Sequence, residues 1–306
     1  MADGAPTWTD PEIDGVRALL KSFDPPEGAP EPTFEMRRTA MDAFGAMTPL
    51  PQGLTQEDAD LDGLPAERLR PADAVEGRAL LYLHGGGYCI GSPRSHRGMA
   101  ARFADQTKAT TLVPDYRLAP EAPFPAAVDD GLKAYRALLD EGYEPRHIAV
   151  SGDSAGGGLT LATMLAAREA GLPMPRCLFL ISPWADLGHH GPSYGHMEPV
   201  DPMITLAGIK EYAAHYGAGA DLNHPYISPA RADLTGLPPM LIHVGQAEVL
   251  LSDSITLAQQ AGMNGVSVHL EVWPEMIHVW HAFHDMLGAA REATAQASAW
   301  MAEQLG

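Results

Sequence analysis

Short apolar runs recur along the chain from about residue 78, and each is long enough to form one buried strand. In order they are RALLYLHG, TTLVPDYR, RHIAVSGD, RCLFLISP, PMLIHVG and SVHLEVWP. Two weaker strand patterns precede them between residues 54 and 71. Apolar positions with helical spacing separate most of the runs, over 95–107, 126–141, 155–170, 252–262 and 278–305. Strands that alternate with helices in this way predict an α/β protein whose mostly parallel sheet is flanked by helices.

Two segments do not fit this alternation. Helical patterns over residues 10–22 and 33–47 precede any strand. In addition, more than fifty residues separate ISPWADL from PMLIHVG, which is longer than a simple crossover needs. We expect both segments to form a helical cap. The predicted organisation is N-terminal cap helices over 1–48, a cap insertion over 188–225, and an α/β core over 49–187 and 226–306.

Composition and charge narrow the class of partner. The chain has 306 residues, 45% of them hydrophobic, which is enough for a large core. It carries 39 acidic and 20 basic side chains, a formal net charge of −19 that repels phosphate backbones and anionic lipid. We therefore expect no nucleic-acid and no membrane partner. Cys89 and Cys177 fit neither a disulfide framework nor a metal site, and no secretory signal is visible, so we expect a cytoplasmic location.

Ser154 is the candidate nucleophile. It stands in GDSAG, between a predicted strand that ends near residue 153 and a predicted helix that begins at 155. A sharp strand-to-helix turn needs small neighbours, and Gly152, Ala155 and Gly156 supply them. The turn would hold the serine hydroxyl above the sheet edge, at a helix N-terminus whose free N–H groups favour an anion.

A glycine run follows the first strong strand, in LLYLHGGGY. Gly85, Gly86 and Gly87 leave the backbone bare, so that its N–H groups are able to approach a ligand closely. An acyl-transfer site needs such fixed donors for the negative oxygen that develops on the carbonyl. We assign this run, Gly86 and Gly87 foremost, to an oxyanion hole together with the N–H of Ala155. His84 precedes the donors, and we expect it to pin the loop.

Two further strand ends supply a base and an acid. His278 follows the last predicted strand, in a loop that opens the final helix, where a neutral imidazole is able to accept the serine proton. Glu248 and Asp253 both follow PMLIHVG, which gives the chain order serine, acid, histidine. We favour Glu248 as the acid because it lies in the strand-end loop. Asp253 stands at the start of the next predicted helix and is the alternative.

The histidines near the C-terminus raise a metal site as an alternative. His281 and His284 follow His278 at steps of three, a spacing that drifts around a helix, and no acidic cluster joins them. We expect no metal and no organic cofactor, because a serine, an imidazole and a carboxylate carry out acyl transfer without one.

The motifs together resemble those of the bacterial hormone-sensitive-lipase-like carboxylesterases, a branch of the α/β-hydrolases. They are HGGGY at 84–88, DYRLAPE at 115–121, GDSAGG at 152–157, SPWADL at 182–187, VGQAEVLLSD at 244–253 and MIH at 276–278. The resemblance runs from about residue 50 to the end. It implies an α/β-hydrolase fold with an eight-stranded sheet and a helical cap, and hydrolysis of small esters with short to medium acyl chains.

Carried over position by position, the resemblance implies Ser154 as nucleophile, His278 as base and the residue at 248 as acid. The family usually has aspartate at this last place, whereas this chain has glutamate, which is one methylene longer. We expect candidates for the substrate pocket at Phe34, Tyr88, Asp153, Trp184, Met203, Ile204 and Tyr212. Asp153 is also a candidate for a purely structural role, as are Arg117 and Glu121 of DYRLAPE.

Three alternatives to a carboxylesterase remain open at this point. A lactonase or an amidase would use the same residues, since specificity lies in the cap pocket. A ligand-binding module of the same fold is disfavoured, because such a module has no need of the histidine at 278. We also expect a homodimer, the commonest assembly of soluble proteins.

Overall fold

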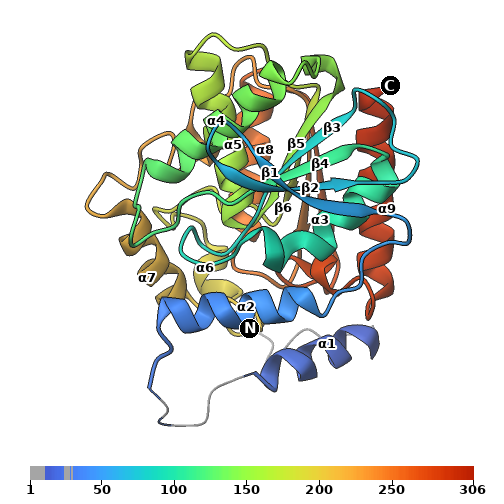
Figure 1. Ribbon diagram of the computed structural model, residues 1–306. Helices are drawn as coiled ribbons and strands as arrows, with labels where there is room; N and C mark the ends of the chain where they lie inside the picture. Colours follow the sequence, from blue (N-terminus) through green and yellow to red (C-terminus); the bar gives the residue numbers. More distant parts are fainter. Residues whose placement is uncertain (1–10, 24–27, 29) are drawn as a thin grey trace.

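The computed structural model describes residues 11–23, 28 and 30–306. Within them the chain forms eight strands: β1 (Thr55–Asp60), β2 (Pro65–Arg70), β3 (Ala79–Leu83), β4 (Thr110–Pro114), β5 (Ile148–Asp153), β6 (Cys177–Ile181), β7 (Met240–Gly245) and β8 (Val268–Trp273). They make one sheet in the order β1-β2-β4-β3-β5-β6-β7-β8 (Figure 1). Strand β2 is antiparallel to both of its neighbours, and every other neighbouring pair is parallel. The mostly parallel, eight-stranded sheet expected from the sequence is therefore confirmed.

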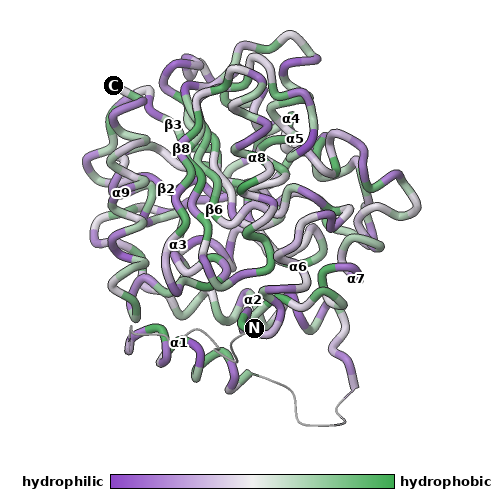
Figure 2. The backbone as a smooth tube through the Cα atoms, turned by 180° about the vertical axis from the view of Figure 1, so that it is seen from behind, coloured by the Kyte–Doolittle hydropathy of each residue, from purple (hydrophilic) through white to green (hydrophobic). Residues whose placement is uncertain are grey.

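Helices cover both faces of the sheet. Side chains on a strand alternate between faces, so Leu81 and Leu83 of β3 pack in one hydrophobic cluster while Leu80 and Tyr82 pack in another. The first face is covered by α4 (Ala126–Asp140), α5 (Ala155–Glu169) and α8 (Leu251–Met263), and the second by α3 (Pro93–Thr107) and α9 (Gly288–Leu305) (Figure 1). In Figure 2 the central strands form a hydrophobic band between these layers. Short 3-10 turns cover Pro145–His147 and Pro229–Arg231.

The last helix begins later than the sequence predicts. The apolar spacing predicts a helix over 278–305, but α9 starts at Gly288, and a separate 3-10 turn covers Trp280–Phe283. Val279 has a φ of 49°, a left-handed conformation that an α-helix of L-residues does not include. Leu287 is extended and ends the irregular segment. His278 therefore lies in a loop that is well separated from the final helix.

Four helices gather at one end of the molecule (Figure 1). They are α1 (Pro11–Lys21), α2 (Phe34–Ala46), α6 (Ser193–His196) and α7 (Leu206–Gly217). Arg37 of α2 forms an ion pair with Glu211 of α7 at 3.2 Å, and Arg38 of α2 forms one with Glu121 at 2.7 Å. These helices come from the two segments expected to form a cap. Residues 1–10, 24–27 and 29 of that expected cap lie outside the described residues, and the domain boundaries stay predictions.

Candidate active site

The turn between β5 and α5 places Ser154 at a sharp corner. Ser154 has a φ of 52° and a ψ of −122°, a conformation that is costly for a residue other than glycine. Its N–H donates to the carbonyl oxygen of Ile181, and its own carbonyl oxygen accepts from the N–H of Trp184, both at 2.8 Å. A Cβ atom on Gly156 would overlap the backbone of Leu83, so the corner requires glycine there. The result is a serine that stays partly exposed between buried neighbours.

His278 lies between this hydroxyl and a carboxylate. Its Nε2 is 3.0 Å from Ser154 Oγ, and its Nδ1 is 2.6 Å from Glu248 Oε2. Because a carboxylate only accepts, Nδ1 carries the proton and Nε2 is left to accept from the serine hydroxyl. Burial disfavours the charged imidazolium, but the hydrogen bond and the charge of Glu248 outweigh it and raise the pKa of His278 above its ordinary value.

Glu248 is fully buried and both of its carboxylate oxygens are hydrogen-bonded. Oε2 accepts from His278, while Oε1 accepts from the N–H of Gly245 at 2.5 Å and from Ser182 Oγ at 2.9 Å. Such donors replace the water that a buried carboxylate loses. The arrangement fixes the direction in which the glutamate points.

Asp253, the alternative acid, lies elsewhere. Its Oδ2 accepts from the N–H groups of Ala185 and Asp186, each at 2.9 Å, and its Oδ1 accepts from the Tyr194 hydroxyl at 2.8 Å. Burial raises the pKa of Asp253 to about 8. Oδ2 therefore holds the SPWADL segment in place and Oδ1 holds Tyr194, and it is Glu248 that the structure brings to His278.

Ser182 is a residue that the sequence analysis did not single out. It follows β6 directly, with a φ of 45°, and its side chain is fully buried. Its hydroxyl accepts from the N–H of Val279 at 3.1 Å, so its one proton is directed to Glu248. Ser182 thus contacts both the acid and the residue next to His278. The signals in the sequence were its place at the end of a buried strand and at the start of the SPWADL motif.

The glycine run differs from expectation at one position. The N–H of Gly85 donates to Asp153 Oδ1 at 3.1 Å, so Gly85 is not a free donor, and its assignment to the oxyanion hole is wrong. Gly86 and Gly87 have φ values of 108° and 61°, which favour glycine. Within the described part of the chain, no acceptor bonds the N–H groups of Gly86, Gly87 or Ala155. These three groups remain candidates for the hole.

The sequence of this chain is similar to those of known proteins. A family model for the alpha/beta hydrolase fold matches residues 80–282. The chain belongs to the α/β-hydrolase family. It is 43% identical over 298 residues to an acetyl-hydrolase of Streptomyces hygroscopicus, covering 97% of this chain and 98% of that protein. It is 32% identical over 295 residues to the carboxylesterase NlhH of Mycobacterium tuberculosis, covering 92% and 86% respectively.

The solved structures that are similar to this chain are also structures of esterases. An esterase/lipase from an uncultured bacterium superposes with a TM-score of 0.92 at 46% identity, over 97% of this chain and 99% of that one. An esterase of the bacterial hormone-sensitive lipase family superposes with a TM-score of 0.93 at 39% identity, over 98% and 100%. The resemblance to hormone-sensitive-lipase-like esterases is confirmed.

A buried polar network lies behind the nucleophile of this α/β-hydrolase. Besides Gly85, Asp153 accepts from the Tyr82 hydroxyl at 2.7 Å and lies 3.4 Å from His96 Nε2. His84 Nδ1 lies 2.8 Å from the carbonyl oxygen of Gly85, and burial lowers the pKa of His84 to about 3. His84 is therefore neutral and holds the glycine run, as expected. Asp153 is buried and supports the same loop, so its assignment to the substrate pocket is wrong.

The other pocket candidates divide into core and surface. Tyr88 is fully buried and stacks on Tyr216 at 3.8 Å, and Trp184 is only 1% exposed, so both belong to the core, contrary to expectation.

Tyr212 of α7 lies against Gly87, where a Cβ atom would overlap its ring. Phe34 packs edge-on against Tyr212, with ring centroids 5.4 Å apart. Ile204 is half-buried and Met203 is exposed. Among the candidates that remain, Tyr212 lies against the glycine run.

The three C-terminal histidines do not converge. His281 Nε2 lies 3.2 Å from His243 Nδ1, and His284 pairs with Asp285 at 3.4 Å, whereas His278 faces Ser154. Over residues 11–23, 28 and 30–306, no group of three or more histidine, cysteine, aspartate or glutamate side chains is placed to hold a metal ion. The metal alternative therefore has no support in the described residues.

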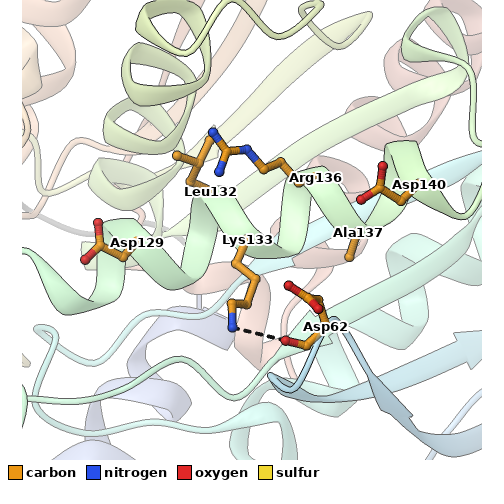
Figure 3. A pocket seen from close by; sticks show the side chains of 7 residues that line it. All are labelled: Asp62, Asp129, Leu132, Lys133, Arg136, Ala137 and Asp140. Carbon is orange, nitrogen blue, oxygen red and sulfur yellow. Dashed lines mark hydrogen bonds between the residues drawn. The ribbon is translucent and has the colours of Figure 1, made fainter.

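A polar hollow of about 240 Å³ lies along the outer side of α4 (Figure 3). Along the helix, two basic side chains stand between two acidic ones, and Lys133 Nζ donates to the carbonyl oxygen of Asp62 at 3.0 Å. Its lining residues are Asp62, Asp129, Leu132, Lys133, Arg136, Ala137 and Asp140. None of them belongs to the glycine run or lies beside Ser154, so this hollow is separate from the candidate active site.

Proposed function

We propose that this α/β-hydrolase, a carboxylic ester hydrolase, cleaves esters with short to medium acyl chains through an acyl-enzyme on Ser154. The observation that carries the proposal is an unbroken chain of hydrogen bonds. It runs from Ser154 Oγ to His278 Nε2 at 3.0 Å and from His278 Nδ1 to Glu248 Oε2 at 2.6 Å. A serine, a histidine and a carboxylate joined in this order form the catalytic triad of serine hydrolases.

In the acylation step, the ester carbonyl oxygen lies toward the N–H groups of Gly86, Gly87 and Ala155. Ser154 Oγ attacks the carbonyl carbon while its proton moves to His278 Nε2. The negative oxygen of the tetrahedral intermediate accepts hydrogen bonds from the three donors, of which each is worth about 3–4 kcal/mol in comparable enzymes. When the intermediate collapses, the ester C–O bond breaks, and the alkoxide takes the proton from Nε2 and leaves as the alcohol.

Deacylation follows the same path with water as the nucleophile. His278 removes a proton from the water, the hydroxyl attacks the acyl carbon, and Ser154 recovers its proton as the carboxylic acid leaves. In both steps Glu248 stabilises the imidazolium that forms. Glu248 stabilises the charged imidazolium in the resting enzyme too, and for this reason it raises the pKa of His278.

The substrate class is a small ester that enters beneath the four helices at one end of the molecule. Tyr212 and Phe34 give an aromatic wall beside the glycine run. A related esterase, EstE5, which is 46% identical to this chain, has been soaked with p-nitrophenyl butyrate, a short-chain ester. Among the described helices, none has both the length and the apolar character that crossing a membrane requires. The cytoplasmic location and the homodimer stay predictions.

Replacement of the nucleophile tests the proposal. Ser154→Ala should abolish hydrolysis of p-nitrophenyl butyrate, with a fall in kcat of about 10⁴-fold or more. Ser151→Ala is the matched control: Ser151 lies on the same strand, its hydroxyl is buried without a hydrogen-bond partner among the described residues, and its loss should leave kcat unchanged. A Ser154→Ala variant that kept its activity would exclude the acyl-enzyme. Higher kcat/KM on a lactone or an anilide than on the matched ester would reassign the substrate class.

A further inference from the structure

Asp201 connects the inserted segment to the loop that carries Glu248. It lies between α6 and α7, it is 9% exposed, and its carboxylate accepts hydrogen bonds from three backbone N–H groups. Its Oδ1 accepts from Met203 and Ile204, at 2.9 and 3.0 Å. Its Oδ2 accepts from Val249, the residue after Glu248, at 2.9 Å. One carboxylate therefore holds two segments that are far apart in the sequence.

The surroundings of Asp201 explain why a charged group is tolerated there. Three N–H donors replace the water that a buried carboxylate loses. Arg17 of α1 also interacts electrostatically with Asp201, and its Nη1 donates to the carbonyl oxygen of Val200 at 3.2 Å. An asparagine in this place would keep one acceptor oxygen, but its amide group donates hydrogen bonds and is unable to satisfy the second segment.

We propose that Asp201 is a positioning residue for the reaction, which fixes the Glu248 loop and adds a second negative charge behind His278. This inference rests on the proposed function of Glu248. Val249 is held through its N–H by Asp201 and through its carbonyl oxygen by Ser193 Oγ, so loss of the first bond removes one of two anchors next to the acid. A displacement of about 1 Å in a catalytic group is enough to cost about 100-fold in rate.

The charge of Asp201 should also affect the pH dependence of the reaction. Three carboxylates act electrostatically on His278 and favour its charged form: Glu248, Asp201 and Asp153. Burial raises the pKa of Asp201, while His278 and the three backbone N–H donors act against this effect, and Asp201 in turn favours the charged form of Arg17. Removal of one negative charge lowers the pKa of the imidazole. Because catalysis needs the neutral imidazole, the acid limb of the pH profile should then move to lower pH.

The test compares two aspartates of the inserted segment. Asp201→Asn should lower kcat for p-nitrophenyl butyrate by about 10- to 100-fold with little change in KM, and should shift the acid limb of kcat/KM to lower pH. Asp221→Asn is the control, since Asp221 is exposed and accepts from the N–H of Asn223 at 2.9 Å, away from Glu248. It should leave kcat and the pH profile unchanged. Thermal unfolding shows whether each variant is folded.

The possible outcomes separate the proposals. If Asp201→Asn keeps the kcat of the parent enzyme, or loses kcat with an unshifted acid limb, Asp201 is not a positioning residue. If Asp201→Asn does not fold, Asp201→Ser, which keeps a smaller acceptor without the charge, is measured against the same two criteria. If Ser154→Ala is inactive while Asp201→Asn behaves like the parent enzyme, the inference fails and the proposed function stands. If Ser154→Ala is active, the proposed function is wrong, and the inference about Asp201, which depends on it, is wrong as well.

Discussion

The two halves of the candidate active site are built in different ways. On the nucleophile side, Ser154 and its small neighbours belong to one strand–turn–helix, and the glycine run follows the strand β3 that pairs directly with β5. On the acid–base side, Glu248 and His278 follow β7 and β8, and Ser182 follows β6. Backbone shape determines the first half, whereas hydrogen bonds between distant side chains determine the second.

This difference matters for how each half responds to substitution. A bulky residue in the nucleophile corner meets backbone atoms, which have no room to move, as the overlap of a Gly156 Cβ with Leu83 shows. A change on the acid–base side removes one hydrogen bond from a network in which Glu248 keeps others. We therefore expect losses on the acid–base side to scale with how much of the network is removed, from the whole carboxylate down to one donor, and losses at the glycines to come from a displaced backbone.

The largest expected effect concerns the two acidic residues. Glu248→Ala should lower kcat by about 10⁴-fold, because the imidazole loses both its orientation and its counter-charge. Asp253→Ala should instead lower the free energy of unfolding, since two N–H groups of the SPWADL segment lose their acceptor. Steady-state kinetics and chemical denaturation measure the two effects. A reversed result, with activity lost in Asp253→Ala and kept in Glu248→Ala, would reassign the acid.

A smaller loss is expected at the glycine run. Gly86→Ala adds a methyl group that overlaps the carbonyl of Ile90, at a φ of 108° that only glycine adopts readily. The displaced N–H should cost about 10²- to 10³-fold in kcat, the range for the loss of one oxyanion donor. Gly77→Ala is the matched control, with a φ of 80° but open space around the added atom. Equal kcat losses in both variants would show that backbone strain, and not a lost donor, lowers the rate.

The sequence predicted the nucleophile side more fully than its surroundings. GDSAG, the glycine run and the strand alternation carry local signals, and Ser154, Gly86 and Gly87 lie where they indicated. Gly85 was assigned wrongly because its partner, Asp153, lies far away in the sequence. The buried packing of Tyr88 and Trp184 also depends on long-range contacts that no local pattern reports.

On the acid–base side, the sequence narrowed the acid to two residues, and the choice of Glu248 depended on its place in the loop. The structure brings Glu248 to His278 because Ser182 and Gly245 hold its other oxygen. Both partners stand in motifs of the sequence, SPWADL and VGQAEVLLSD, but no local pattern shows that they contact Glu248. The late start of α9 was missed for the same reason: Val279 adopts a left-handed conformation, although valine is a residue that rarely does so.

The smallest expected effect is at Ser182, and it separates hydrogen bonding from backbone strain. Ser182→Ala removes the donor to Glu248 and leaves the N–H of Val279 without its acceptor, while Gly245 and His278 still hold the carboxylate. We expect kcat to fall about tenfold, the equivalent of one hydrogen bond to a charged group. Ser182→Gly lacks the hydroxyl as well but relieves the strain at a φ of 45°.

If the hydroxyl is what matters, kcat in steady-state assays should fall equally in the two variants, while the glycine variant unfolds at a higher temperature than the alanine variant. If activity instead follows stability, so that Ser182→Gly is as active as the parent enzyme, the acid–base side depends on backbone shape after all. The contrast between the two halves would then be wrong, because Ser182, which bonds both Glu248 and the His278 loop, would act through its backbone conformation.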